Sequence, residues 1–233
     1  MKYILSDPIL DIQISQIRRK IILSMNGEVS ESMSNHGIVY KKNYGVSIIR
    51  LREIARTIEK NHDIAQRLWM SNSRETMILA TLLQPYPTFT KELALEWQIK
   101  CDNIELIEQA CINLYKHLEF APELCMEFIK SEDVSQQTFG FTLALWIYEK
   151  LTLNEIKLII DFILKNYKSF NDVVLINKIS LSCAKFTRKD KATAMYILDS
   201  FKKHSNSRVK VLNHIYQTIA QELIFLGYLN DDV

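Results

Sequence analysis

The chain of 233 residues is 48% hydrophobic, which is enough apolar material for a sizeable core. Its 5 glycines and 4 prolines are too few for an all-β protein with many tight turns, and no run of about 18 apolar residues suggests a membrane span. The opening sequence MKYILSDPILDI lacks the long apolar segment of a secretory signal peptide. The 4 cysteines match no zinc-binding spacing, so we expect free thiols in the core and a reducing, cytoplasmic location.

The formal net charge of +2 hides an uneven distribution of charge along the chain. Residues 1–60 carry 10 basic and 6 acidic side chains, residues 61–164 carry 8 and 15, and residues 165–210 carry 11 and 3. An acidic middle therefore separates two basic flanks. If the chain curves so that the flanks face each other, they line a basic cleft suited to a polyanion. The alternative is an ordinary solvated surface with scattered lysines.

The first predicted helix covers residues 9–25, where isoleucines and leucines recur with helical spacing. The next segment, 26–43, contains Gly, Asn and Ser without a clear period, and we expect an irregular loop or a disordered segment there. From Ser47 to Gly227, amphipathic stretches alternate with short breaks, and capping residues mark several helix starts. The helices predicted in this region are 48–58, 63–70, 74–83, 88–100, 104–118, 122–130, 135–150, 153–167, 173–186, 189–204 and 207–226.

This succession of helices with almost no strand signal is typical of helical repeat proteins. Each helix pair would bury its apolar stripe against the neighbouring pairs, which gives an α–α superhelix of the HEAT-like or ARM-like kind. We therefore predict an all-α, C-shaped solenoid with a concave groove, made of ten to twelve helices in antiparallel pairs. No linker divides the chain, so residues 1–233 are expected to form a single repeat domain.

The usual catalytic signatures are absent, since the sequence has no P-loop, no G-x-G-x-x-G, no G-x-S-x-G and no H-E-x-x-H. The 5 histidines are far apart and none has a neighbour at metal-ligand spacing, which argues against a metalloenzyme. One carboxylate stands out, because Glu108 shares its side of a helix with Ile104, Cys111, Ile112 and Tyr115. A carboxylate at the rim of an apolar stripe is either functional, or it reaches water or a lysine of a neighbouring helix.

Two short motifs lie near the start of the repeats. The first is Asn43-Tyr44-Gly45-Val46 with Leu51-Arg52-Glu53-Ile54-Ala55, and the second is Ala65-Gln66-Arg67-Leu68-Trp69 with Ser73-Arg74-Glu75. They resemble the aromatic-Gly-Val segment, the Leu-Arg pair, and the Leu-Trp, short turn and Arg-Glu of the DNA alkylation repair family of HEAT-like repeat DNA glycosylases (the AlkD type). In number and order of helices the resemblance covers nearly the whole chain.

The resemblance implies a basic concave surface that holds duplex DNA. Active members of the family remove cationic alkylated bases, such as 3- or 7-methylpurines, and need neither a metal nor an organic cofactor. An acidic residue stabilises the oxocarbenium-like sugar as the base leaves, and tryptophans line the cleft beside it.

Matching the catalytic stretch of the family to this chain places Glu108 at the acid and Glu105 at an earlier aspartate. At the other matched positions, tryptophans are replaced by Asn103, Ile104 and Ser182, and arginines by Lys185 and by Gln136 or Gln137. The charge of the acid is kept, but the aromatic walls that would hold a cationic base are lost. The resemblance therefore implies a family member that lacks the usual catalytic constellation or has rebuilt it.

From the sequence we predict a DNA-binding protein of this family, in which Glu108 is the catalytic carboxylate if base excision is retained. The partner expected is duplex DNA, alkylated or not, bound by a monomer without a nucleotide cofactor or a membrane. The residues predicted to bind DNA phosphates are Arg52, Arg56, Lys178, Lys185, Arg188 and Lys189. The competing hypothesis is a protein-interaction scaffold, because α-solenoids also bind peptides and partner helices.

Overall fold

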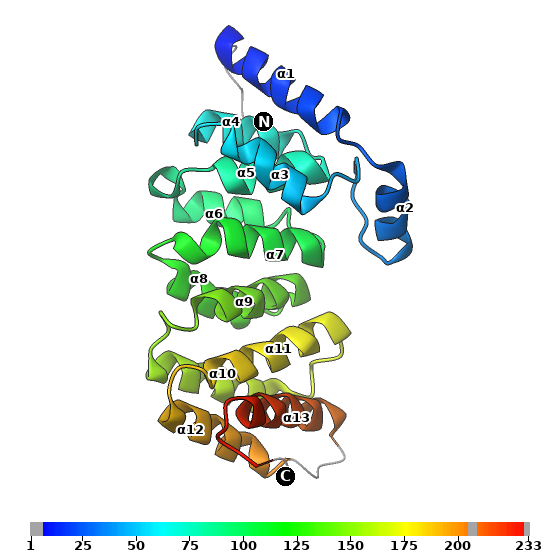
Figure 1. Ribbon diagram of the computed structural model, residues 1–233. Helices are drawn as coiled ribbons and strands as arrows, with labels where there is room; N and C mark the ends of the chain where they lie inside the picture. The colour runs from blue at the N-terminus through cyan, green and yellow to red at the C-terminus, as the bar shows by residue number, and fades with distance from the viewer. Residues whose placement is uncertain (1–6, 205–208, 231–233) are drawn as a thin grey trace. The chain divides into compact units, whose positions relative to one another are not determined.

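The computed structural model describes residues 7–204 and 209–230, and these form thirteen α-helices, two short 3₁₀-helices and no β-strand (Figure 1). The all-helical prediction is confirmed, with slightly more helices than the ten to twelve expected. None of the helices in the described ranges is long and apolar enough to cross a bilayer.

The chain packs as two compact units, Met1–Leu118 and Glu119–Val233, called unit 1 and unit 2 below. The helices of unit 1 are α1 (Pro8–Ile22), α2 (Gly27–Asn35), α3 (Ile48–Arg56), α4 (His62–Met70), α5 (Arg74–Leu83), η1 (Tyr86–Thr88), α6 (Lys91–Gln98), α7 (Ile104–Asn113) and η2 (Tyr115–His117). The helices of unit 2 are α8 (Ala121–Ile129), α9 (Val134–Ile147), α10 (Leu153–Asn166), α11 (Val173–Phe186), α12 (Lys191–Lys202) and α13 (Lys210–Phe225).

Unit 1 has an aromatic core between its helices. Helices α3, α5 and α7 lie side by side, while α4 packs on α5 and α1 contacts both α3 and α4. Trp69 of α4 stacks on Trp97 of α6 with ring centroids 4.0 Å apart, and Phe89 meets the edge of Trp97. The hydroxyl of the buried Tyr115 donates a hydrogen bond to the carbonyl of Ala94 at 2.6 Å. These tryptophans therefore stabilise the interior of the unit and do not line its surface.

Unit 2 consists of two layers of helices. Helices α9, α11 and α13 lie side by side, α8 packs on α9, α12 packs on α13, and α10 contacts α8 and α12. Gly140 lets α9 approach α8 closely, because a Cβ there would lie 2.7 Å from the backbone nitrogen of Ile129. The Ser182 hydroxyl of α11 donates to the carbonyl of Phe141 of α9 at 2.7 Å. This serine, which the sequence resemblance matches to a tryptophan of the family, thus bonds α11 to α9.

The expectation of an irregular loop at 26–43 is wrong for its first half, which contains α2. Asn26 caps this helix by accepting a hydrogen bond from the backbone N–H of Val29. The sequence pattern failed there because α2 buries none of its residues, so it shows no apolar stripe. The rest of the segment, 36–43, has no helix.

Other helix boundaries also differ from the predicted ones, most of them by three residues or fewer. The helix predicted at 104–118 ends at Asn113, because Leu114 leaves helical geometry at φ −129° and ψ −63°, and η2 follows. The predicted start of the last helix at Ser207 lies outside the described residues, and α13 is described from Lys210.

The four cysteines are buried free thiols, as the sequence predicts. Burial raises the pKa of Cys101, Cys125 and Cys183, and a neighbouring acid adds to the shift at the first two. A thiol with a raised pKa forms little thiolate at neutral pH and is a weak nucleophile. These cysteines fill the core and take no part in a site.

Candidate functional site

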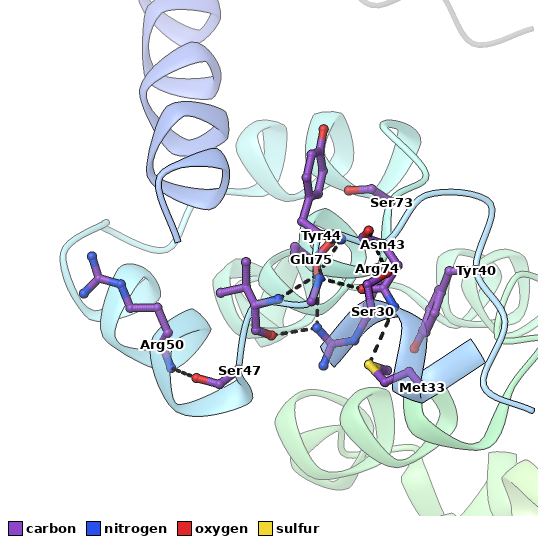
Figure 2. Close-up of polar contacts among 12 residues, drawn as sticks. Ser30, Met33, Tyr40, Asn43, Tyr44, Ser47, Arg50, Ser73, Arg74 and Glu75 are labelled. Carbon is purple, nitrogen blue, oxygen red and sulfur yellow. Dashed lines mark hydrogen bonds and ion pairs between the residues drawn. The ribbon is translucent and has the colours of Figure 1, made fainter. Parts of the chain in front are cut away.

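The two motifs near the start of the repeats meet in a buried polar cluster of unit 1 (Figure 2). Glu75, at the first turn of α5, is 0% exposed, and both oxygens of its carboxylate accept the backbone N–H of Tyr44 at 3.1 Å. The backbone N–H of Val46 also donates to Glu75, at 3.3 Å. A buried carboxylate is stable when its lone pairs are satisfied in this way. The second motif therefore fixes the backbone of the first.

Arg74 neutralises this carboxylate and a second one. Its Nη1 donates to Glu75 at 3.1 Å and to the carbonyl of Val46 at 2.7 Å, while its Nε and Nη2 donate to Glu105 at 2.8 and 2.6 Å. Burial acts to lower the pKa of Arg74, but the hydrogen bonds and charges of Glu105 and then Glu75 outweigh it and raise the pKa overall. The bidentate contact is the strongest geometry for an arginine and a carboxylate.

Tyr40 completes the cluster by donating its hydroxyl proton to Glu105 at 2.8 Å. Burial and then the charge of Glu105 raise the pKa of Tyr40, so the phenol stays protonated and remains a donor. Glu105, which matches an earlier acid of the family's catalytic stretch, is thus held by Arg74 and Tyr40. It has a structural role in this chain.

Gly45 allows α2 to attach to the first motif. Its φ is +69°, and a Cβ would lie 1.9 Å from the carbonyl oxygen of Asn26. The backbone N–H of Asn26 donates to the carbonyl of Tyr44 at 2.8 Å, and the hydroxyl of Ser30 donates to the carbonyl of Asn43 at 3.1 Å. No other residue type fits at this glycine without moving α2.

Glu108, the predicted catalytic acid, lies half-buried on α7. Asn103, which the sequence resemblance matches to a tryptophan of the family, caps α7 by accepting the backbone N–H of Leu106 at 3.1 Å. Ile104 is the first residue of the same helix and is half-buried. The tryptophans of unit 1 lie in the core, so in the described residues of this unit no indole is exposed beside Glu108.

A basic groove runs along one edge of unit 1, at the C-terminal ends of α3, α5 and α7. It has a volume of about 450 Å³ and is lined by Arg52, Ala55, Arg56, Ile58, Lys60, Leu82, Leu83, Tyr86, Ile112, Asn113 and His117. None of these lining residues is acidic. The Nζ of Lys60 lies 4.1 Å from the ring centroid of Tyr86, and that ring stacks on His117 at 4.6 Å. Cations at helix C-termini are stabilised by the helix dipoles.

The structure brings Arg52 and Arg56 together with Lys60, Tyr86 and His117, which the sequence did not predict as site residues. Both arginines are exposed on α3, four residues apart, and Lys60 follows at the same spacing beyond the end of the helix. This spacing is visible in the sequence. Tyr86 and His117 carried no signal, because each lies in a short 3₁₀-helix between longer helices.

The predicted phosphate-binding residues of unit 2 are mostly engaged by other groups. Lys178 is only 8% exposed, and Lys185 lies over the ring of Tyr148 with its Nζ 4.8 Å from the centroid. Arg188 pairs through Nε with Glu222. Lys189 donates from Nζ to two backbone carbonyls of the segment after α9, at 2.9 and 2.6 Å. Lys185, Arg188 and Lys189 are near one another, whereas Lys178 is two turns of α11 earlier.

In the described ranges, no three His, Cys, Asp or Glu side chains gather as a metal site.

Comparisons with known proteins agree with the fold. A family model described as "DNA alkylation repair enzyme" matches residues 17–176. A solved structure aligns with a TM-score of 0.75 at 14% identity, covering 93% of this chain and 95% of that chain. That protein belongs to a family described as related to the HEAT-like repeat DNA glycosylases, with affinity for branched DNA structures. No curated protein matches the chain. Since the family model spans well over half of the sequence, the chain belongs to the DNA alkylation repair family and has its HEAT-like repeat fold.

Proposed function

We propose that this protein binds DNA, duplex or branched and alkylated or not, through the basic groove of unit 1. The observation that carries the proposal is the groove itself, which combines Arg52, Arg56 and Lys60 with no acidic lining residue. Within the described part of the chain, neither arginine forms an ion pair, so both guanidinium groups are available to a phosphate. The affinity of a structural relative for branched DNA supports the same class of ligand.

Binding of this kind depends on phosphate contacts and has little sequence preference. Each arginine that contacts a phosphate releases condensed counterions, so the logarithm of the affinity falls linearly with the logarithm of the salt concentration. The apolar floor of the groove, formed by side chains such as Leu82 and Ile112, offers no donors that read base edges in duplex DNA.

The test is the double variant Arg52→Gln, Arg56→Gln. Its affinity for a duplex and for a four-way junction should fall at low salt, and the slope of log affinity against log salt should decrease by about 2, close to 0.9 per lost contact. The matched control is Lys202→Gln, Lys203→Gln, which removes the same charge from exposed positions at the end of α12. Equal losses in both variants would show a general charge effect and reject the groove. No binding of the native chain to any DNA at low salt would favour the protein scaffold.

We further propose that base excision by this chain is weak or lost. A cationic base held between aromatic walls gains about 0.5–2 kcal/mol per cation–π contact, and Asn103, Ile104 and Ser182 supply none. The measurement is release of 3-methyladenine and 7-methylguanine from methylated DNA. Robust release by the native protein would overturn this part of the proposal.

If excision is detected, Glu108 is the proposed acid. Its carboxylate would stabilise the positive charge that develops on the sugar, and the leaving base is already cationic and needs no proton. Glu108→Gln keeps the shape and removes the charge, so it should lower base release by a factor of about 10² or more with DNA affinity nearly unchanged. Equal release by both forms would remove Glu108 from the mechanism.

A further inference from the structure

Three cation–aromatic pairs follow one edge of unit 2, at the C-terminal ends of α9, α11 and α13. The centroid distances are 4.8 Å for Lys185 over Tyr148, 5.8 Å for Arg188 over Phe225 and 5.9 Å for Lys191 over Tyr228. The cations come from the end of α11 and the start of α12, and the rings from the residues that end α9 and α13. We call these six residues the aromatic edge.

The rings of the aromatic edge are not core residues. Phe225, the last residue of α13, is 77% exposed. Tyr148 and Tyr228 are half-buried. Part of each ring is exposed to solvent, and each ring lies beside a positively charged side chain.

Arg188 is held in place by two neighbours. Glu222 accepts a hydrogen bond from its Nε, and Phe225 lies against its guanidinium. In the described ranges neither Nη1 nor Nη2 of Arg188 has a hydrogen-bond partner, so the outer edge of the guanidinium can still donate to a phosphate. Two other acids lie nearby. Glu149 accepts the hydroxyl proton of Tyr148, whose ring is half-buried. Asp190, next to Lys191 in the chain, caps α12 by accepting the backbone N–H of Thr193.

We propose that the aromatic edge binds unpaired nucleotides of a DNA strand. The bases would stack on Phe225 and Tyr148, and the phosphates would contact Lys185, Arg188 and Lys191. Exposed rings interleaved with cations are what single-stranded nucleic acid recognises, because every base has a π-face and every nucleotide a phosphate. In a duplex the bases are already stacked on one another and do not reach such a surface.

The groove of unit 1 lacks this capacity. Its ring, Tyr86, is already covered by Lys60 and His117, so the groove offers charge without a free stacking platform. The aromatic edge consists of other residues in the other unit. The inference therefore adds unpaired bases to the duplex phosphates of the proposed function. An experiment can refute one of the two without refuting the other.

The experiment compares two probes by titration calorimetry, an oligothymidylate of about 15 nucleotides and a duplex of the same length. Phe225→Ala and Tyr148→Ala should each weaken oligothymidylate binding by about 5- to 150-fold, the size of one lost stacking contact, and change duplex binding by less than about twofold. Phe225→Trp should keep the single-strand affinity, since an indole also stacks. The control is Ile99→Ala, which removes a 74% exposed apolar side chain from unit 1 and should change neither affinity.

Each outcome decides between the two proposals. The inference is overturned if both alanine variants bind oligothymidylate as well as the native protein does. It is also overturned if the native protein binds the duplex but not oligothymidylate. Neither result contradicts the proposed function. If the native protein binds oligothymidylate but not the duplex, and Phe225→Ala loses the oligothymidylate binding, the inference is supported and the proposed function is rejected. Thermal unfolding of each variant checks that it is folded.

Discussion

The two units present the same kind of edge with different chemistry. In each, three neighbouring helices end together and basic side chains gather at their C-termini, where the helix dipoles favour positive charge. In unit 1, Arg52 and Arg56 line a groove without an acid. In unit 2, Glu222 pairs with Arg188 and backbone carbonyls bind Lys189. The net charge of a sequence segment therefore overstates the charge that is available to a ligand, because part of it is neutralised by tertiary contacts.

The largest expected difference between the units concerns their arginine–carboxylate contacts. Arg74→Met would leave the carboxylates of Glu75 and Glu105 without their cation, and breaking a buried pair in this way costs about 3–5 kcal/mol. Arg188→Met, which breaks the partly exposed pair with Glu222, should cost about 1 kcal/mol or less. Urea unfolding of both variants measures the two costs. Equal losses would mean that the cluster of unit 1 contributes no more than a surface pair.

The next effect tests whether the engaged cations of unit 2 still bind DNA. Replacing Lys185, Arg188 and Lys189 together by Ala should weaken binding to all duplex sequences similarly and flatten the salt dependence. Because all three already have protein partners, the slope should fall by less per removed charge than in Arg52→Gln, Arg56→Gln. Binding measured from about 50 to 200 mM salt gives both slopes. An unchanged affinity in the triple variant would place the duplex site wholly elsewhere.

The smallest effect would make unit 2 more like unit 1. Glu222→Gln removes the negative charge beside Arg188 and should raise duplex affinity roughly two- to fivefold, with a loss of stability of at most about 1 kcal/mol. The gain should disappear at high salt, because charges at an exposed site are screened. A lower affinity in this variant would mean that Glu222 positions Arg188 for its ligand, and a neutral glutamine could no longer do so.

The fold could be predicted from the sequence because helix starts and apolar stripes are local signals. Ser47 and Asn103 cap α3 and α7, which begin at the predicted residues 48 and 104, and the motif residues identified the family correctly. The helix α2 could not be predicted, since it buries nothing and depends on contacts with residues 43–45.

The candidate site was harder to predict because its character depends on tertiary contacts. Arg188 and its partner Glu222 are 34 residues apart, and Lys189 is 40 residues from Glu149, whose carbonyl it binds. No local pattern reveals such partners. The same holds for Glu105, which matches an earlier aspartate of the family's catalytic stretch in sequence and is bound by Arg74 and Tyr40 in space. Glu108 as the catalytic residue stays a prediction.

The stacked pair of Trp69 and Trp97 gives the protein its own optical reporter. Both rings are buried in unit 1, whereas Trp146, 45% exposed, is the only other tryptophan and belongs to unit 2. In a Trp146→Phe variant, all tryptophan emission therefore comes from unit 1, and helical circular dichroism follows the whole chain. Coincident transitions would support our prediction that residues 1–233 unfold as a single domain. Separate midpoints would mean that one unit can unfold while the other stays folded. One of the two proposed DNA-binding surfaces could then be lost while the other remains.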